Sequence, residues 1–139
     1  MAMKLKILCF DPARECLPVV EVLNKLEHLS GCSKEFVFLE DLEQLEKSLV
    51  EWNPSLLFVL ADGAVGMESV YRAKGRRPNL PVFWFSDDEL FGVQSYRLDC
   101  AYFSTKPVTE EKLLSALRRC ERLGIVCRAT LKVSGGKRI

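Results

Sequence analysis

The apolar residues of this chain fall into two alternating patterns. Five short and nearly continuous apolar runs are typical of strands that are buried on both faces of a sheet. These runs lie at residues 4–10, 35–39, 56–61, 80–85 and 100–104. After each run the apolar residues recur every three or four positions, which predicts an amphipathic helix. In the clearest example, residues 42–52 follow Asp41, whose side chain suits the cap of a helix.

Strands and helices that alternate in this way predict an α/β fold of the type (βα)5. The remaining helices are expected at residues 17–26, 67–74, 89–96 and 109–123. A parallel sheet follows, because right-handed crossovers between such strands place helices on both of its faces. The expected architecture is a doubly wound, flavodoxin-like sheet with strand order 2-1-3-4-5. In that order the carboxyl ends of strands 1, 3, 4 and 5 meet at one rim.

Polar side chains at that rim are the candidates for chemistry, because open α/β sheets bind ligands at the carboxyl ends of their strands. Lys106 is the most informative of them, since a lysine that ends an apolar strand is poorly placed for solubility alone. The helix after it has Thr109 as its expected cap. The rim also receives Asp11, residues 60–62 and Ser86.

Length and composition indicate one globular domain with room for a core. The chain has 139 residues, of which 48% are hydrophobic and 28% are charged. The first residues lead directly into a strand and do not read as a signal peptide. No apolar stretch reaches the roughly 18 residues that a membrane span needs. The expectation is a cytoplasmic protein that does not enter the membrane.

Six cysteines raise the question of disulfides, metal binding or redox chemistry. None of them forms a Cys-x-x-Cys pair, and His28 is the only histidine. The expectation is therefore reduced, structural thiols. A redox sensor that uses Cys9 or Cys16 near the rim is an alternative.

Charge is distributed unevenly along the chain. Residues 1–117 hold 13 Lys and Arg against 18 Asp and Glu, a net charge of −5, whereas residues 118–139 hold seven basic residues against Glu121, a net charge of +6. An acidic body with a basic tail suggests that the tail approaches something anionic. A solvated linker is the alternative explanation.

The rim residues resemble those of the receiver domain of two-component response regulators. The Lys106-Pro107 pair matches the family's lysine and the proline that follows it. Ser86 matches the switch hydroxyl and Phe103 the switch aromatic, while Asp11 matches the first of two acidic residues after strand 1. The resemblance implies a domain that is not an enzyme. It would accept a phosphoryl group on an aspartate at the end of strand 3, beside Mg²⁺.

The chain departs from that family at two of the positions that the chemistry needs. Pro12 stands where the second acidic residue belongs, and Leu60 falls on the phosphoacceptor position. Asp62 is the only carboxylate nearby, and it could serve if strand 3 ran longer than its apolar run. Mg²⁺ would then depend on Asp11 and Asp62 and bind weakly. Two hypotheses follow: a pseudo-receiver without a cofactor that acts as an interaction or dimerisation module, or a phosphorylatable receiver that uses Asp62 and weakly bound Mg²⁺.

Two further segments suggest a place in transcription regulation. Residues 92–107 resemble the LytR/AlgR class of response regulators, and residues 128–139 resemble the start of a LytTR DNA-binding domain. The expected organisation is a receiver-like domain at 1–123, within which the family resemblance covers 4–123, and a basic linker or tail at 124–139. The implied partners are a histidine kinase or another regulatory protein, and a second copy bound through the fourth helix, fifth strand and fifth helix. DNA would be bound only through a C-terminal domain.

Overall fold

The computed structural model describes residues 4–25 and 33–122, in which strands and helices alternate as the apolar pattern predicts. The bounds of the strands are β1 Lys4–Phe10, β2 Ser33–Leu39, β3 Leu56–Leu60, β4 Val82–Ser86 and β5 Tyr102–Thr105. The bounds of the helices are α1 Leu17–Lys25, α2 Leu42–Glu51, α3 Gly63–Arg76, α4 Phe91–Arg97 and α5 Glu110–Arg122. All strand pairs are parallel and the order is β2-β1-β3-β4-β5, which confirms the predicted fold class.

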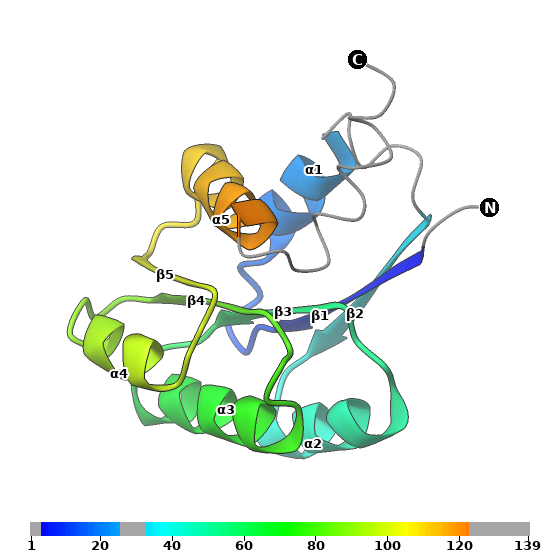
Figure 1. Ribbon diagram of the computed structural model, residues 1–139, viewed down its shortest axis with the longest axis vertical. Helices are drawn as coiled ribbons and strands as arrows, with labels where there is room; N and C mark the ends of the chain where they lie inside the picture. The colour runs from blue at the N-terminus through cyan, green and yellow to red at the C-terminus, as the bar shows by residue number, and fades with distance from the viewer. Residues whose placement is uncertain (1–3, 26–32, 123–139) are drawn as a thin grey trace.

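Helices cover both faces of the sheet. Helices α1 and α5 lie on one face, and α2, α3 and α4 lie on the other (Figure 1). Successive side chains of a strand point to opposite faces, so one strand supplies both cores. In β3, for example, Phe58 belongs to the core under α1 and α5, whereas Val59 belongs to the core under α2 and α3. Every residue of β3 is buried, as its continuous apolar run predicts.

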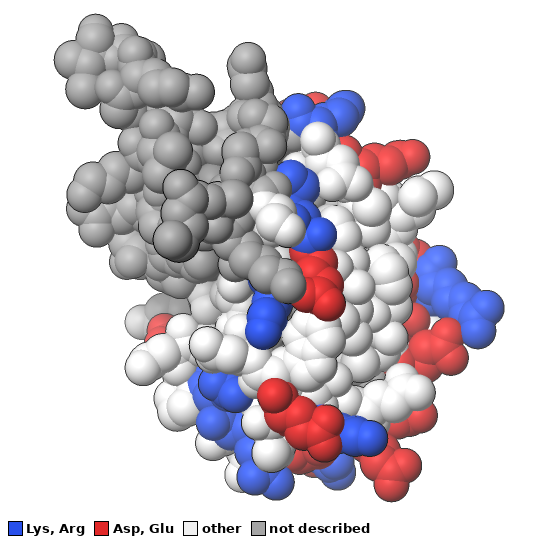
Figure 2. All heavy atoms as spheres, turned by 90° about the vertical axis from the view of Figure 1, so that its right-hand side faces the viewer, with Lys and Arg blue, Asp and Glu red and all other residues white. Residues whose placement is uncertain are grey.

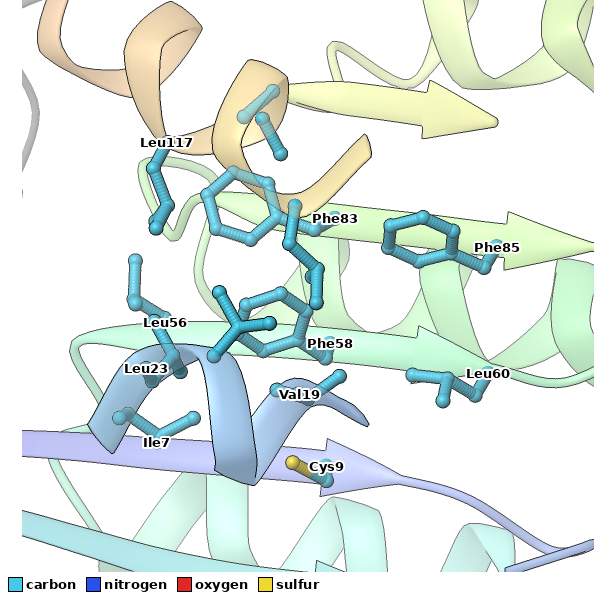
Figure 3. Packing of buried hydrophobic residues seen from close by; sticks show 14 of the residues in the cluster. Ile7, Cys9, Val19, Leu23, Leu56, Phe58, Leu60, Phe83, Phe85 and Leu117 are labelled. Atoms are coloured by element: carbon cyan, nitrogen blue, oxygen red, sulfur yellow. The ribbon is translucent and has the colours of Figure 1, made fainter. Parts of the chain in front are cut away.

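The core under α1 and α5 is built from large side chains of the central strands. Figure 3 shows Phe58, Phe83 and Phe85 in one layer with Val19 of α1 and Leu117 of α5. The rings of Phe58 and Phe83 lie 4.9 Å apart and are tilted by 56°. This packing fixes the positions of β3 and β4, whose carboxyl ends form part of the rim.

The predicted helix caps are confirmed where the structure describes them. The Asp41 carboxylate accepts a hydrogen bond from the Gln44 amide at 2.8 Å, at the start of α2. The Thr109 hydroxyl accepts one from the Lys112 amide at 3.2 Å, at the start of α5. Each side chain satisfies one amide that has no partner within its own helix.

Several predicted boundaries shift by one or two residues, and α3 begins four residues earlier than predicted, at Gly63 directly after its cap residue Asp62. Strand β5 begins at Tyr102, because Cys100 still belongs to the turn that closes α4 and donates its amide hydrogen bond to the Ser95 carbonyl at 2.9 Å. Strand β3 ends at Leu60, not at Asp62. The tail at 124–139 lies outside the described residues.

Candidate functional site

Lys106 stands at the rim, directly after β5. Its amide donates a hydrogen bond to the Ser86 carbonyl at 2.8 Å, which ties the end of β5 to the end of β4. Its side chain is only 14% exposed, and its ammonium group contacts two carboxylates, those of Glu15 and Asp62. The distances from Nζ to the two Asp62 oxygens are 3.2 and 3.3 Å. The structure thus places Lys106 at the rim, where the sequence predicts it, beside two carboxylates.

The surroundings keep the Lys106 side chain charged. Burial alone lowers the pKa of this lysine, but hydrogen bonds to Glu15 and Asp62, together with their negative charges, outweigh it. The net result is a pKa above the ordinary value of 10.5. Lys106 is therefore a fixed cation whose charge is already balanced by groups of the same chain.

Asp62 is the N-terminal cap residue of α3, although its side chain does not cap that helix. One of its oxygens, Oδ1, accepts a hydrogen bond from the Asp87 amide at 2.9 Å. The close packing of Gly66 against the Ala61 carbonyl brings the first turn of α3 down onto the end of β3. The Asp62 carboxylate is thereby held at the rim, between the ends of β4 and β5.

Leu60 is the last residue of β3, and its side chain is buried and not exposed at the rim. Its side chain is fully buried in the core under α1 and α5, in the same layer as Phe58 and Phe85 (Figure 3). A leucine has no group that accepts a phosphoryl, and its surroundings are apolar. The position that the sequence analysis assigns to the phosphoacceptor is therefore part of the core.

Asp11 and Glu15 belong to one tightly built loop between β1 and α1. Asp11 is 3% exposed, and its Oδ1 accepts a hydrogen bond from the Glu15 amide at 2.7 Å. Between them Arg14 has a φ of 59°, in the left-handed region that non-glycine residues rarely adopt. Glu15 is the rim residue that the sequence analysis missed. Its position four residues after Asp11, in a loop at the same rim, was the available signal.

The rim carboxylates do not fit a Mg²⁺ site. Among residues 4–25 and 33–122, no three His, Cys, Asp or Glu side chains are grouped so that they could hold a metal ion. Asp11 and Asp62 each already accept a backbone hydrogen bond, and Asp62 also contacts the Lys106 ammonium. Because Mg²⁺ needs several oxygen ligands in octahedral geometry, this donor set is a poor match.

Ser86 and Phe103 are both engaged in local structure. Ser86 is fully buried, and its hydroxyl accepts a hydrogen bond from the Asp88 amide at 3.3 Å, which supports the turn before α4. The Phe103 ring is half-buried and packs edge-on against Trp84, with 5.4 Å between the ring centres. The predicted switch residues therefore have structural partners here, and their role in switching stays a prediction.

The described thiols are poor nucleophiles. Burial, followed by the nearby Cys16 and Asp11, raises the pKa of Cys9 far above its ordinary value. Burial and a hydrogen bond with Asp11 raise the pKa of Cys16 to about 11, so about one Cys16 side chain in 10,000 is a thiolate at pH 7. This chemistry does not favour the redox sensor. Cys32, Cys127 and His28 lie outside the described residues.

A groove lies between α4 and α5, over the edge strand β5. It encloses about 610 Å³. The residues that line it are Gly92, Ser95, Tyr96, Cys100, Ala101, Tyr102, Phe103, Ser115, Arg118 and Arg119. Tyr96 is 86% exposed, and both arginines are exposed as well. This face contains the elements through which the sequence analysis expects a second copy to bind.

The opposite end of the sheet has a different surface. On the face at the β2 end, acidic and basic side chains are interspersed around an area without charge (Figure 2). Charged side chains of the described residues also form ion pairs, as Arg14 does with Glu40 at 2.8 Å and Arg76 with Glu46 at 2.8 Å. The acidic excess of residues 1–117 is therefore not gathered into one patch on this face.

Solved structures of similar shape are receiver domains and related proteins. A CheY-like response regulator receiver domain from Methanospirillum hungatei JF-1 superposes with a TM-score of 0.61 and 14% identity, over 85% of this chain and 92% of that chain. The signal receiver domain of an HD domain-containing protein from Pseudomonas fluorescens Pf-5 gives 0.62 and 20%, over 84% and 93%. The pilus assembly protein CpaE from Caulobacter crescentus CB15 gives 0.61 and 18%, over 82% and 89%.

The comparisons by sequence give no match, either to a protein-family model or to a curated protein. No helix within the described ranges is long and apolar enough to span a membrane. The strand order, the two helical layers and the superpositions agree with one another. The chain therefore has the flavodoxin-like fold of CheY-like receiver domains.

Proposed function

We propose that this domain is a pseudo-receiver, a signal-transduction module that binds other proteins without being phosphorylated itself. One observation carries the proposal: the Lys106 ammonium is already bound by two carboxylates of its own chain. The residue at the phosphoacceptor position, Leu60, is at the same time buried in the core. The lysine of the family is present, but its charge is met by Glu15 and Asp62 of the same chain and not by an external phosphoryl group.

The charge of the rim supports this proposal. Asp11, Glu15 and Asp62 contribute three negative charges there, against one positive charge from Lys106. Phosphorylation of Asp62 would replace the single negative charge of its carboxylate by the roughly two negative charges of an acyl phosphate at neutral pH, a net gain of about one. Without a well-formed metal site to offset them, that product is destabilised by repulsion between like charges.

The face formed by α4, β5 and α5 is the proposed interaction surface. Leu90, Val93 and Tyr96 are 75%, 57% and 86% exposed on or next to α4, beside the groove that Arg118 and Arg119 line. Exposed apolar side chains in a row are typical of a surface that another protein covers. We propose that this face binds a second copy of the chain.

The wider context follows from the resemblance. We propose a cytoplasmic member of the LytR/AlgR class in which the domain controls a DNA-binding domain that begins after residue 123. Its input would come from a histidine kinase or another regulatory protein. The fold alone does not choose between these contexts, because a pilus assembly protein and response regulator receivers share it.

A phosphorylatable receiver is the second candidate, and one distance favours it. Asp62 lies 3.2 Å from the Lys106 ammonium, so a carboxylate is within reach of the lysine that matches the family, although Leu60 itself has no carboxylate. In this alternative Asp62 would accept the phosphoryl group, and Ser86 and Phe103 would respond to it.

Mass spectrometry of the intact protein separates the two candidates. Wild type and Asp62→Ala are incubated with acetyl phosphate and MgCl2, alongside an ordinary receiver domain as a positive control. The pseudo-receiver predicts no adduct on either variant under conditions that modify the control. A labile phosphoryl adduct on wild type that is missing from Asp62→Ala would refute the proposal and establish the phosphorylatable receiver.

A further inference from the structure

The Glu15 side chain is placed by its loop and not left free at the surface. Its amide is held by the Asp11 carboxylate at 2.7 Å, and the Arg14 amide donates to the Asp11 carbonyl at 3.1 Å. Arg14 adopts a left-handed backbone conformation and pairs with Glu40 at the end of β2. The loop is thus anchored immediately before Glu15, and the Glu15 carboxylate reaches the Lys106 ammonium across the rim.

The contact that Glu15 makes joins distant parts of the chain. Its Oε1 accepts a hydrogen bond from Lys106, which is 91 residues away in the sequence. The Lys106 side chain is 14% exposed, so most of its surface is removed from water and the ion pair is screened less than a surface pair. Asp62 completes the surroundings of the ammonium group.

Lys106 in turn fixes the end of β5. Its amide is bound to the Ser86 carbonyl, and the Lys112 ammonium binds the carbonyls of Thr105 and Pro107 at 2.6 and 3.1 Å. Phe103, three residues earlier, lines the groove between α4 and α5. The short strand β5 therefore connects Lys106 at the rim with Phe103 at the proposed interaction face.

We propose that Glu15 is the internal anion of this domain, a positioning residue that holds Lys106 and thereby keeps the end of β5 in one position. The inference rests on the proposed function in one respect, since it takes the rim to hold no phosphoryl group. Glu15 supplies from within the chain the negative charge that an external anion would otherwise bring to Lys106. The face of α4, β5 and α5 is then set by the sequence and not by a modification.

Hydrogen exchange of the Lys106 amide tests this proposal. The variant Glu15→Gln keeps the shape of the side chain and removes its charge. The control Glu40→Gln makes the same change at the carboxylate that pairs with Arg14 of this loop, which does not contact Lys106. Both side chains are about half exposed, so neither variant disturbs the core. Exchange is followed residue by residue by NMR on the full chain.

The expected result is specific to one variant and one region. In Glu15→Gln the amide of Lys106 exchanges about three- to tenfold faster than in wild type, and the signals of Phe103 shift. In Glu40→Gln both stay as in wild type, and changes are confined to the loop around Arg14. Changes in Glu15→Gln that stop at residues 11–16, with unaltered exchange at Lys106, would overturn the proposal.

The same samples keep this inference separate from the proposed function. A phosphoryl adduct on wild type after treatment with acetyl phosphate would refute the pseudo-receiver, whatever the exchange data show. Unaltered exchange at Lys106 in Glu15→Gln, with no adduct on wild type, would refute the role of Glu15 and leave the pseudo-receiver intact.

Discussion

The packing of α3 onto the end of β3 gives the sharpest prediction, because the contact leaves room for the hydrogen atom of a glycine but not for a methyl group. Gly66 lies in the first turns of α3 and is buried. A Cβ atom at this position would lie 2.3 Å from the Ala61 carbonyl oxygen, 2.9 Å from its carbon and 3.3 Å from Nε1 of Trp84. The two closest atoms belong to the backbone, so no side-chain rotation relieves the contact.

Two effects of Gly66→Ala oppose each other, and their sizes decide the sign. Alanine favours a helix over glycine by about 1 kcal/mol. To accept the methyl group, however, the start of α3 must move from Ala61 by about 1 Å, and overpacking of this kind costs about 1–3 kcal/mol or more. We expect Gly66→Ala to lower the free energy of unfolding by about 1–2 kcal/mol. The shift also moves Asp62, one turn earlier, relative to Lys106.

Gly75→Ala is the matched control for this experiment. Gly75 lies in the same helix, and apart from its chain neighbours and the adjacent backbone of α3 no atom comes within 4 Å of a Cβ built on it. The same gain in helix propensity is then unopposed, and we expect this variant to be about 0.5–1 kcal/mol more stable than wild type. Urea unfolding followed by circular dichroism measures both variants. A Gly66→Ala protein as stable as Gly75→Ala would refute the reasoning.

Three further predictions concern the core, the thiols and α2. Leu60→Asp should lower the free energy of unfolding by about 3–5 kcal/mol in urea, because it places a carboxylate among apolar side chains; wild-type stability would show that the side chain reaches the rim. The pKa of Cys16 is raised from 9.0 to about 11. Between these two pH values the folded protein keeps the thiol proton that the unfolded chain has lost. This contribution to stability is complete below pH 9 and is lost as the pH rises towards 11. Unfolding at several pH values should show a smaller alkaline loss in Cys16→Ser, and equal losses would contradict the assignment. Arg77→Ala removes guanidinium hydrogen bonds to the carbonyls of Leu49 and Trp52 at the end of α2, which should lower the thermal midpoint through a loss of about 1–2 kcal/mol, with Arg77→Lys as control.

The sequence by itself determined the order of the elements and the class of fold. Continuous apolar runs that alternate with helical periods leave few arrangements other than a parallel sheet with helices on both faces. Local chemistry also placed Asp41 and Thr109 at their helix caps and Lys106 at the rim. All of these features depend on residues that are close together in the chain, and such residues act through the short-range preferences of the backbone.

Only the tertiary structure decided which side chains meet at the rim. The pattern did not show whether β3 ends at Leu60 or at Asp62, because the two positions are two residues apart and an extended strand would point both side chains to the same face. The pairing of Glu15 with Lys106 depends on the left-handed backbone of Arg14 and on the distance between β1 and β5. Neither quantity is encoded in a local period, because both arise only when the sheet has assembled and its loops have closed over the rim.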